Sequence, residues 1–193
     1  MTSRVPISYK NGSNIFFFEQ LECSTALDSF SCFIDEYNNY LFEDALRSQN
    51  DHVALTWLLR ERDSNTIISY MSIIADAIKL SATEKELHSL DYPFKTIPAI
   101  KIAKLAVSQS AHEKYKSIGT YMINKAAGLA RICNRQLFAA RFLTVDADIE
   151  HDEGVLAFYE KNGFIPNAEL VKKNSKTISM RKDIYQRKET KIK

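Results

Sequence analysis

A chain of 193 residues is the right length for one compact core, because domains usually hold about 50 to 200 residues. Apolar residues make up 45% of it and charged residues 26%, which excludes the disordered and collagen-like classes. The longest apolar stretches, at 16–18 and 68–78, are shorter than the roughly 20 residues that a membrane helix needs. No apolar segment followed by a cleavage site opens the chain, so we expect a cytoplasmic protein without a membrane span.

The cysteines argue against two other classes of protein. The chain has three cysteines, Cys23, Cys32 and Cys133, without CxxC spacing or a nearby histidine pair. An odd number argues against a disulfide scaffold, and the missing spacing argues against a zinc site. We interpret them as small buried apolar residues.

Charge is distributed unevenly along the chain. Nine basic and two acidic residues lie in 172–193, a net charge of +7, whereas the 17 basic and 22 acidic residues of 1–171 give −5. Any attraction to a polyanion is therefore expected in the tail.

The first half of the chain predicts a strand, a helix and a long hairpin. Residues 14–21 fit a strand, and Ser24 is a candidate N-cap for a helix whose apolar residues recur at steps of three or four. These apolar residues are Leu27, Phe30, Ile34, Tyr37, Leu41 and Ala45. Residues 52–80 are rich in β-branched and aromatic side chains, with turn chemistry at 62–65, and predict two antiparallel strands.

The second half alternates strands with helices. Residues 81–97 are polar and predict a loop with one short helix. The remaining elements are, in order, a strand at 97–107, a helix at 117–134, a strand at 142–147, a helix at 154–164 ended by Asn162-Gly163, and a strand at 176–184. This order predicts a single α/β domain with a mixed sheet.

Residues 114–119 join the strand ending at Val107 to the following helix. A turn with small residues before a helix start offers unpaired N–H donors and the positive end of the helix dipole, which suits a phosphate. An ordinary connection between a strand and a helix looks much the same, so both interpretations stand on these residues alone.

The LAV sequence at 105–107, the KYKSIG turn at 114–119 and FYEKNGF at 158–164 resemble, in order and spacing, the acetyl-CoA-binding core of GNAT acetyltransferases. The resemblance extends over about residues 20–184 and is greatest to the branch that includes toxin-antitoxin acetyltransferases acting on aminoacyl-tRNA. It implies a V-shaped, mostly antiparallel mixed sheet flanked by helices, a GNAT domain at 1–184 and a basic C-terminal tail at 185–193.

The resemblance also assigns residues to the cofactor. The family's turn pattern, Gln/Arg-x-x-Gly-x-Gly/Ala, falls on Lys114, Ser117 and Gly119, and Ser117 places a side chain where the family keeps a bare backbone. Pantetheine would pair with backbone groups of the 97–107 strand as an added strand would. The acetyl-CoA-binding residues implied are Leu105, Ala106, Val107, Lys114, Tyr115, Lys116, Ser117, Ile118, Gly119 and Thr120.

Acetyl transfer from a thioester to an amine needs an oxyanion donor, an acid for the sulfur and a neutral amine. The resemblance implies the backbone N–H near Val107 as the first and Tyr159 as the second. A phenol near pKa 10 protonates a thiolate with a conjugate acid near 8.5 only with help, such as the helix N-terminus or water. Without the resemblance, a tyrosine beside Phe158 on an amphipathic helix reads as core.

The amine is the third need. No Asp or Glu lies in 99–107, where many GNAT enzymes place a base. We therefore expect an acceptor amine of low pKa, such as an α-amine at about 7.7 to 8.0, or proton transfer through water.

Two charged segments have competing interpretations. Asp146, Asp148, His151, Asp152 and Glu153 form an acidic loop before the Tyr159 helix, either a solvated helix start or a source of a base or acceptor contact, and we predict no metal there. Lys172, Lys173, Lys176, Arg181 and Lys182 belong to the basic segment 172–193, either a solvated terminus or a contact to RNA phosphates.

The leading hypothesis is therefore an acetyl-CoA-dependent N-acetyltransferase, toxin-like by resemblance, with acetyl-CoA as co-substrate. The acceptor stays open among a small amine, a peptide or protein amine and an aminoacyl-tRNA. The alternatives are a module that binds coenzyme A with little or no catalysis, and a protein that acts through its surfaces alone. The resemblance also suggests a homodimer, although no sequence feature fixes its interface.

Overall fold

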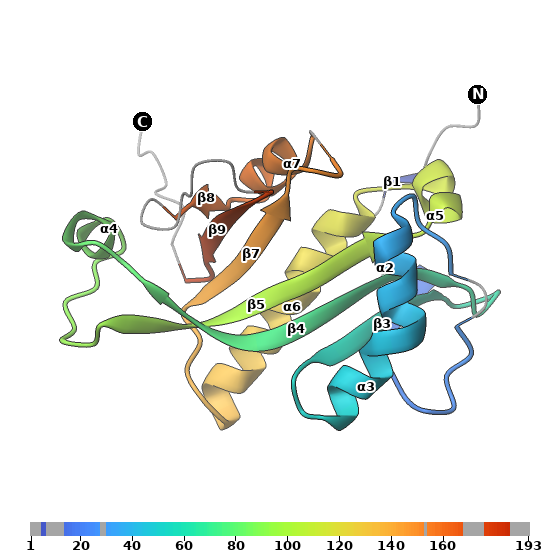
Figure 1. Cartoon of the computed structure of the whole chain (residues 1–193), viewed down its shortest axis with the longest axis horizontal. Helices are drawn as coiled ribbons and strands as arrows, with labels where there is room; N and C mark the ends of the chain where they lie inside the picture. The colour runs from blue at the N-terminus through green and yellow to red at the C-terminus, as the bar shows by residue number, and fades with distance from the viewer. Residues whose placement is uncertain (1–4, 7–13, 28–29, 153, 168–175, 186–193) are drawn as a thin grey trace. The chain divides into compact units, whose positions relative to one another are not determined.

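The computed structural model describes the chain except for residues 1–4, 7–13, 28–29, 153, 168–175 and 186–193 (Figure 1). Two compact units make up the chain. The first unit comprises Met1–Ala75 and Ile102–Leu129, and the second comprises Asp76–Lys101 and Ala130–Lys193. Strands β4 (Ile67–Lys79) and β5 (Thr96–Val107) and helix α6 (Ile118–Gln136) each contribute residues to both units.

Seven strands are hydrogen bonded in the order β2-β3-β4-β5-β7-β9-β8. Their other bounds are β2 Phe16–Gln20, β3 Leu55–Glu61, β7 Phe142–Asp148, β8 Ile165–Pro166 and β9 Thr177–Asp183. The pairs β2–β3, β3–β4, β7–β9 and β8–β9 are antiparallel. The structure thus confirms the α/β class and a mostly antiparallel sheet flanked by helices.

The helices are short apart from α6. They are α2 Asp35–Asn39, the π turn η1 Tyr40–Asp44, α3 Ala45–Asn50, α4 Ala82–Leu87, α5 Gln109–Lys114 and α7 Val155–Lys161. A separate pair of two-residue strands, β1 (Val5–Pro6) and β6 (Tyr115–Lys116), runs parallel.

In the first unit, α2 to α3 and α6 pack on the sheet through different side chains. Leu41 and Ala45 of the first helices lie in one cluster with Leu58, Tyr70 and Ala106 of the strands. On α6, Tyr121 meets Phe16 of β2, with ring centroids 6.3 Å apart. Ala106, at the end of β5 where the resemblance places pantetheine, is thus packed into the core of the first unit.

The helix expected after Ser24 begins only at Asp35, so that prediction was wrong for residues 24–27 and 30–34. The Thr25 hydroxyl accepts a hydrogen bond from the Glu22 N–H (3.0 Å), which makes a turn. Asn38 binds both the N–H (2.8 Å) and the carbonyl (3.1 Å) of Cys32. These side-chain bonds compete with helical ones, while Phe30 and Cys32 are still buried.

The hairpin prediction is confirmed. β3 and β4 pair antiparallel from Leu55 opposite Ile73 to Arg60 opposite Ile67, with a register shift between Leu59 and Arg60. The turn at 62–65 ends in Asn65, whose φ is 58°. Asparagine tolerates this left-handed conformation better than most residues. The expectation for the cysteines holds for Cys32, which is buried, but fails for Cys23, which is exposed.

In the second unit, α4 is fixed at its first turn. Ser81 and Glu84 form a reciprocal capping box, in which the Glu84 Oε2 accepts from the Ser81 N–H at 2.9 Å. The other carboxylate oxygen of Glu84 lies 2.7 Å from Nη1 of Arg181 on β9. One carboxylate therefore caps the helix and also ties it to the last strand.

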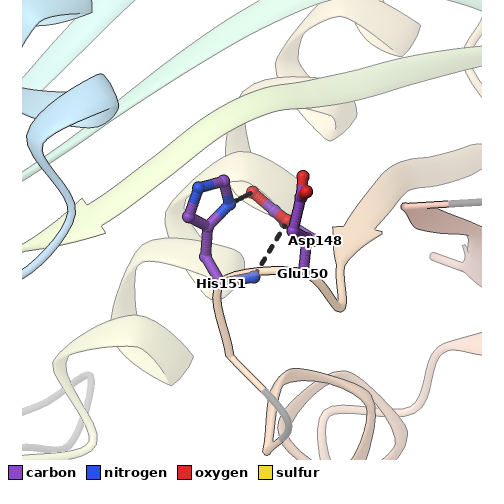
Figure 2. Close-up of side chains that lie close together, drawn as sticks. All are labelled: Asp148, Glu150 and His151. Carbon is purple, nitrogen blue, oxygen red and sulfur yellow. Dashed lines mark hydrogen bonds and ion pairs between the residues drawn. The ribbon is translucent and has the colours of Figure 1, made fainter.

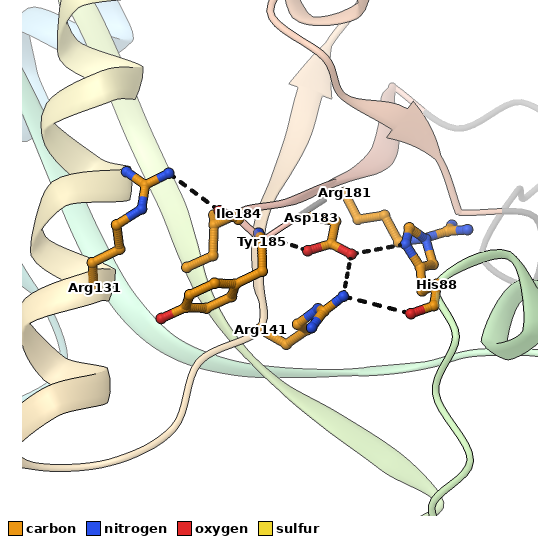
Figure 3. A network of polar contacts seen from close by, with 7 residues as sticks. All are labelled: His88, Arg131, Arg141, Arg181, Asp183, Ile184 and Tyr185. Atoms are coloured by element: carbon orange, nitrogen blue, oxygen red, sulfur yellow. Dashed lines mark hydrogen bonds and ion pairs between the residues drawn. The ribbon is translucent and has the colours of Figure 1, made fainter. Parts of the chain in front are cut away.

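Figure 3 shows a polar network beside this contact. The Asp183 carboxylate meets His88 Nδ1 at 3.1 Å and Arg141 Nη2 at 2.8 Å, and the Arg181 Nε lies 3.4 Å from His88 Nε2. Burial lowers the pKa of His88 below its ordinary value, and the two arginines add to this effect against the opposing pull of Asp183. A neutral ring, donating from Nδ1 and accepting at Nε2, fits both neighbours.

This network changes the interpretation of the basic segment 172–193. The Arg181 side chain is only 2% exposed and is paired with Glu84, and the Lys176 ammonium lies 2.7 Å from Glu150. Lys182 Nζ lies 5.9 Å from the ring centroid of Phe164. Arg181 is therefore not a surface contact for RNA, while Lys172 and Lys173 lie outside the described residues.

Candidate functional site

The end of β5 carries the first group of expected cofactor residues. Leu105 and Val107 are half-buried, and Ala106 is buried in the core of the first unit. The Ala106 carbonyl accepts a hydrogen bond from the Ser69 hydroxyl at 2.5 Å, and the Ser108 N–H donates to the Ile68 carbonyl at 2.9 Å. Strand β4 thus anchors this backbone on both sides of Val107.

A short helix that the sequence analysis missed follows this strand. The buried Ser108 accepts at its hydroxyl from the Ala111 N–H (3.2 Å) and starts α5, which ends at Lys114. The signal was present, since a serine before a helix-compatible stretch is a preferred N-cap. The turn therefore joins α5 to α6, by way of β6, rather than β5 to α6 directly.

Ser117, at the position of the family's glycine, has a φ of 68°. This is the left-handed region, where a residue with a Cβ is strained by about 1 kcal/mol or more. The Ser117 carbonyl accepts from the Tyr121 N–H at 2.9 Å, so α6 begins directly after it. The backbone at this point has the conformation that glycine would adopt freely, although the residue is serine.

The remaining turn residues are also in the first unit. Ile118 is buried, while Gly119 and Thr120 are half-buried in the first turn of α6, which contains no acidic residue. The N–H groups of a first helical turn have no intrahelical acceptor. The positive end of the dipole of this 19-residue helix therefore has no carboxylate on its own first turn.

Lys114 and Tyr115 are engaged by a carboxylate from another strand. Both the Lys114 ammonium and the Tyr115 hydroxyl donate to Oε1 of Glu61, at the end of β3, and Ser64 donates to its Oε2 at 2.5 Å. Lys114, then Ser64 and Tyr115, hold the pKa of Glu61 at about 2, and Glu61 raises the pKa of Lys114 to about 12. Both groups are thus charged at neutral pH.

The backbone of the same turn pairs with the start of the chain. Val5 lies opposite Tyr115 and Pro6 opposite Lys116 in the parallel β1–β6 pair. Sequence patterns gave no signal for this contact, because two-residue strands are too short for a detectable period.

Tyr159, the expected acid, lies on α7 in the second unit. It is 8% exposed, and its ring packs edge to face against Phe158 (5.1 Å) and Phe164 (5.2 Å). Its carbonyl accepts from the N–H groups of Asn162 and Phe164, and Gly163 (φ 83°) makes the turn that returns Phe164 to the ring. The helix and its Asn-Gly end are confirmed.

Carboxylates reach the second-unit part of β5 from neighbouring strands. Asp146 of β7 lies 2.6 Å from the Lys101 ammonium of β5, and Asp76 of β4 accepts from the Thr144 hydroxyl of β7 at 2.5 Å. The absence of an acid in 99–107 therefore does not leave this strand without acidic neighbours. Asp76 was missed because its contact joins residues 68 positions apart.

The acidic loop before α7 is largely paired, and Figure 2 shows the contact between His151 and Asp148. The His151 Nδ1 lies 2.8 Å from Asp148, and the Asp152 carboxylate accepts from the Gly154 N–H at 2.8 Å. Asp148, Glu150 and His151 offer ligand atoms within 4.8 Å of one another, but Glu150 pairs with Lys176. These contacts fit a solvated helix start; Glu153 lies outside the described residues.

Several solved structures resemble this chain over most of its length. AtaT complexed with acetyl-methionyl-tRNAfMet matches with a TM-score of 0.68 and 19% identity, over 85% of this chain and 93% of that one. A tyrosine-to-phenylalanine mutant of KacT matches with a TM-score of 0.68 and 18% identity, over 86% of this chain and 95% of that one. AtaTR bound with AcCoA matches with a TM-score of 0.67 and 19% identity, over 87% of this chain and 94% of that one. No protein-family model matches the chain.

The chain has the GNAT fold. At identities of 18–19% the likeness establishes the fold, and it confirms the resemblance stated from the sequence as far as the fold is concerned. Within the GNAT fold, the expected cofactor residues of 105–107 and 114–120 all belong to the first unit, and Tyr159 belongs to the second. Among the described residues, no helix is long and apolar enough to cross a membrane.

Proposed function

We propose that this protein is an acetyl-CoA-dependent N-acetyltransferase. The observation that carries the proposal is Ser117 in the left-handed conformation directly before α6. A serine there is strained, and it stands at the position where the family has glycine. The fold shared with AtaTR, a protein solved with AcCoA bound, supports the same cofactor.

In this proposal the cofactor lies on the first unit. The pyrophosphate takes the N–H groups that follow Ser117, as anions do at helix starts, and pantetheine pairs with the backbone of 105–107. The turn's cations, Lys114 and Lys116, supply positive charge. The Val107 N–H is the proposed donor to the oxyanion that forms at the thioester carbonyl.

Tyr159 is the proposed general acid. The acceptor nitrogen bonds to the acetyl carbon, the carbon–sulfur bond breaks, and the sulfur takes the phenol proton. The proton lost by the amine returns to the phenolate through water, so the cycle balances. A mutant in which tyrosine is replaced by phenylalanine features in the KacT structure, which supports a functional tyrosine in proteins of this fold.

The acceptor is proposed to be an α-amine, and an aminoacyl-tRNA is the favoured carrier. AtaT is described in complex with acetyl-methionyl-tRNAfMet, which bears an acetylated α-amine. An α-amine is also the kind of acceptor that is partly neutral at physiological pH without a strong base.

The test uses labelled acetyl-CoA and fractionated cell extract, for the wild type and Tyr159→Phe. Transfer of label to the RNA fraction by the wild type alone would support the full proposal, whereas label in protein or metabolites would change the acceptor. Binding of acetyl-CoA without turnover across these fractions would instead favour the alternative, a module that holds coenzyme A without catalysis.

A further inference from the structure

Lys114, the cation that the turn would offer to the cofactor, already forms an ion pair with a carboxylate of the protein, Glu61. Lys114 stands where the family has Arg or Gln, and its ammonium is held by Glu61 of β3. The ammonium side chain remains 58% exposed, whereas that of Glu61 is 15% exposed. The lysine is therefore the movable partner and the glutamate the fixed one.

Glu61 is fixed by three donors from two parts of the chain. The Ser64 hydroxyl binds one oxygen at 2.5 Å, and Tyr115 and Lys114 share the other. Tyr115 is itself held, since it is buried and packs edge to face on Phe16 at 5.1 Å. The carboxylate thus stays in place when the lysine leaves.

The electrostatic consequence is a competition. The ammonium also lies 5.1 Å from the centroid of the Tyr115 ring, so in its present position it has two attractive contacts within the protein. A phosphate bound at the start of α6 is stabilised by Lys114 only by the amount that its attraction exceeds the attraction of those two contacts. The phosphate is also repelled by the negative charge of Glu61.

We propose that Glu61 sets the affinity of the turn for the acyl donor by competing with its phosphates for Lys114. This inference rests on the proposed function, because it needs acetyl-CoA to bind at 114–120. It makes Glu61 an affinity-determining residue: donor binding requires the ammonium to move from the carboxylate to a phosphate.

The alternative is that Glu61 serves as a scaffold, holding Lys114 and Tyr115 so that the turn keeps its shape. The two roles predict opposite changes in the affinity for acetyl-CoA when Glu61 loses its charge. Competition predicts that Glu61→Gln tightens acetyl-CoA binding, since glutamine can still accept from Ser64 and Tyr115 but carries no charge. A scaffold predicts weaker binding.

The experiment is a double-mutant cycle measured by calorimetric titration of the full chain with acetyl-CoA. Glu61→Gln should lower the Kd by about five- to tenfold at low salt, as expected for one charge near a polyanion. Lys114→Met should weaken binding more in the Glu61→Gln protein than in the wild type, because only there is the ammonium fully available.

The matched control is Glu113→Gln, which removes one negative charge beside Lys114 from an exposed position on α5. It should change the Kd by less than twofold. Thermal melts of all variants establish that they are folded, and Lys114→Met alone, which leaves the buried side chains intact, gives a further comparison if Glu61→Gln is unstable.

The results separate the two levels of inference. Acetyl-CoA binding by the wild type with an unchanged or raised Kd in Glu61→Gln would overturn the competition and leave the proposed function standing. A smaller effect of Lys114→Met in the Glu61→Gln background would do the same. Absence of binding by every variant, wild type included, would overturn the proposed function and this inference with it.

Discussion

Nδ1 of His88 lies 3.1 Å from Oδ2 of Asp183, and both side chains are almost completely buried. The contact joins the residue that follows α4 to the last residue of β9. Because the ring is desolvated and faces two arginines, its pKa is lowered in the folded protein. Protonating it should therefore oppose folding.

This gives a pH prediction. A histidine with a lowered folded pKa binds fewer protons when folded than when unfolded, so stability is complete above about pH 6.5, the unfolded value, and declines as the pH falls toward the folded pKa. Urea unfolding at pH 8 and pH 5.5 should show the loss. A His88→Gln variant should be less stable at pH 8 but lose less on acidification; an equal loss would contradict the assignment.

A second prediction concerns the strained serine. Ser117→Gly should raise the free energy of unfolding by about 1 kcal/mol, because glycine adopts a φ of 68° without a Cβ clash and this gain exceeds its larger unfolded-state entropy. The same change at Ser110, inside α5, should destabilise by about 0.5–1 kcal/mol. Chemical denaturation measures both, and destabilisation at Ser117 would contradict the strain.

A third prediction concerns the proposed acid. Tyr159→Phe keeps the ring that packs on Phe158 and Phe164, so the melting temperature should change little. Removing the hydroxyl should lower kcat for acetyl transfer by about a hundredfold or more while the Kd for acetyl-CoA stays within a few fold. Phe158→Leu, a neighbouring change that keeps the hydroxyl, is the control, and comparable turnover by Tyr159→Phe would exclude the role.

A fourth prediction concerns the acceptor. At pH 7.4 an α-amine of pKa near 7.8 is about 30% neutral, whereas a lysine side chain is about 0.1% neutral. A peptide that carries both amines should therefore be acetylated mainly at its N-terminus, with a preference on the order of a hundredfold. Mass spectrometry of the product locates the acetyl group, and a preference for lysine would point to a general base, for which Asp146 and Asp76 are the carboxylates beside β5.

The parts of the fold that the sequence predicted are those governed by local chemistry. The 62–65 turn, the Asn162-Gly163 helix end and the long apolar face of α6 each depend on residues within a few positions. The helix start was misplaced because Phe30 and Ile34 keep a helical spacing although they lie outside the helix. The Cys32 backbone between them bonds to the Asn38 side chain in a non-helical form. Periodicity does not distinguish those two causes of burial.

The candidate site was predictable only in its residue types. The resemblance indicated Lys114, Ser117 and Tyr159, but not that Glu61 holds the first, that the second is left-handed or that Lys114 ends a separate helix, α5. Glu61 and Lys114 are 53 positions apart, and no local pattern links a hairpin turn to a later helix end. Such contacts depend on tertiary packing.

The capping box of α4 has a consequence for how the protein is made. Glu84 needs Arg181, 97 positions later in the sequence, to satisfy its second oxygen. A chain emerging from the ribosome displays the α4 segment well before that arginine is synthesised. This helix should consequently become protected from proteases only after the C-terminal strand has been released, so ribosome-bound chains stalled before residue 181 should be cleaved there.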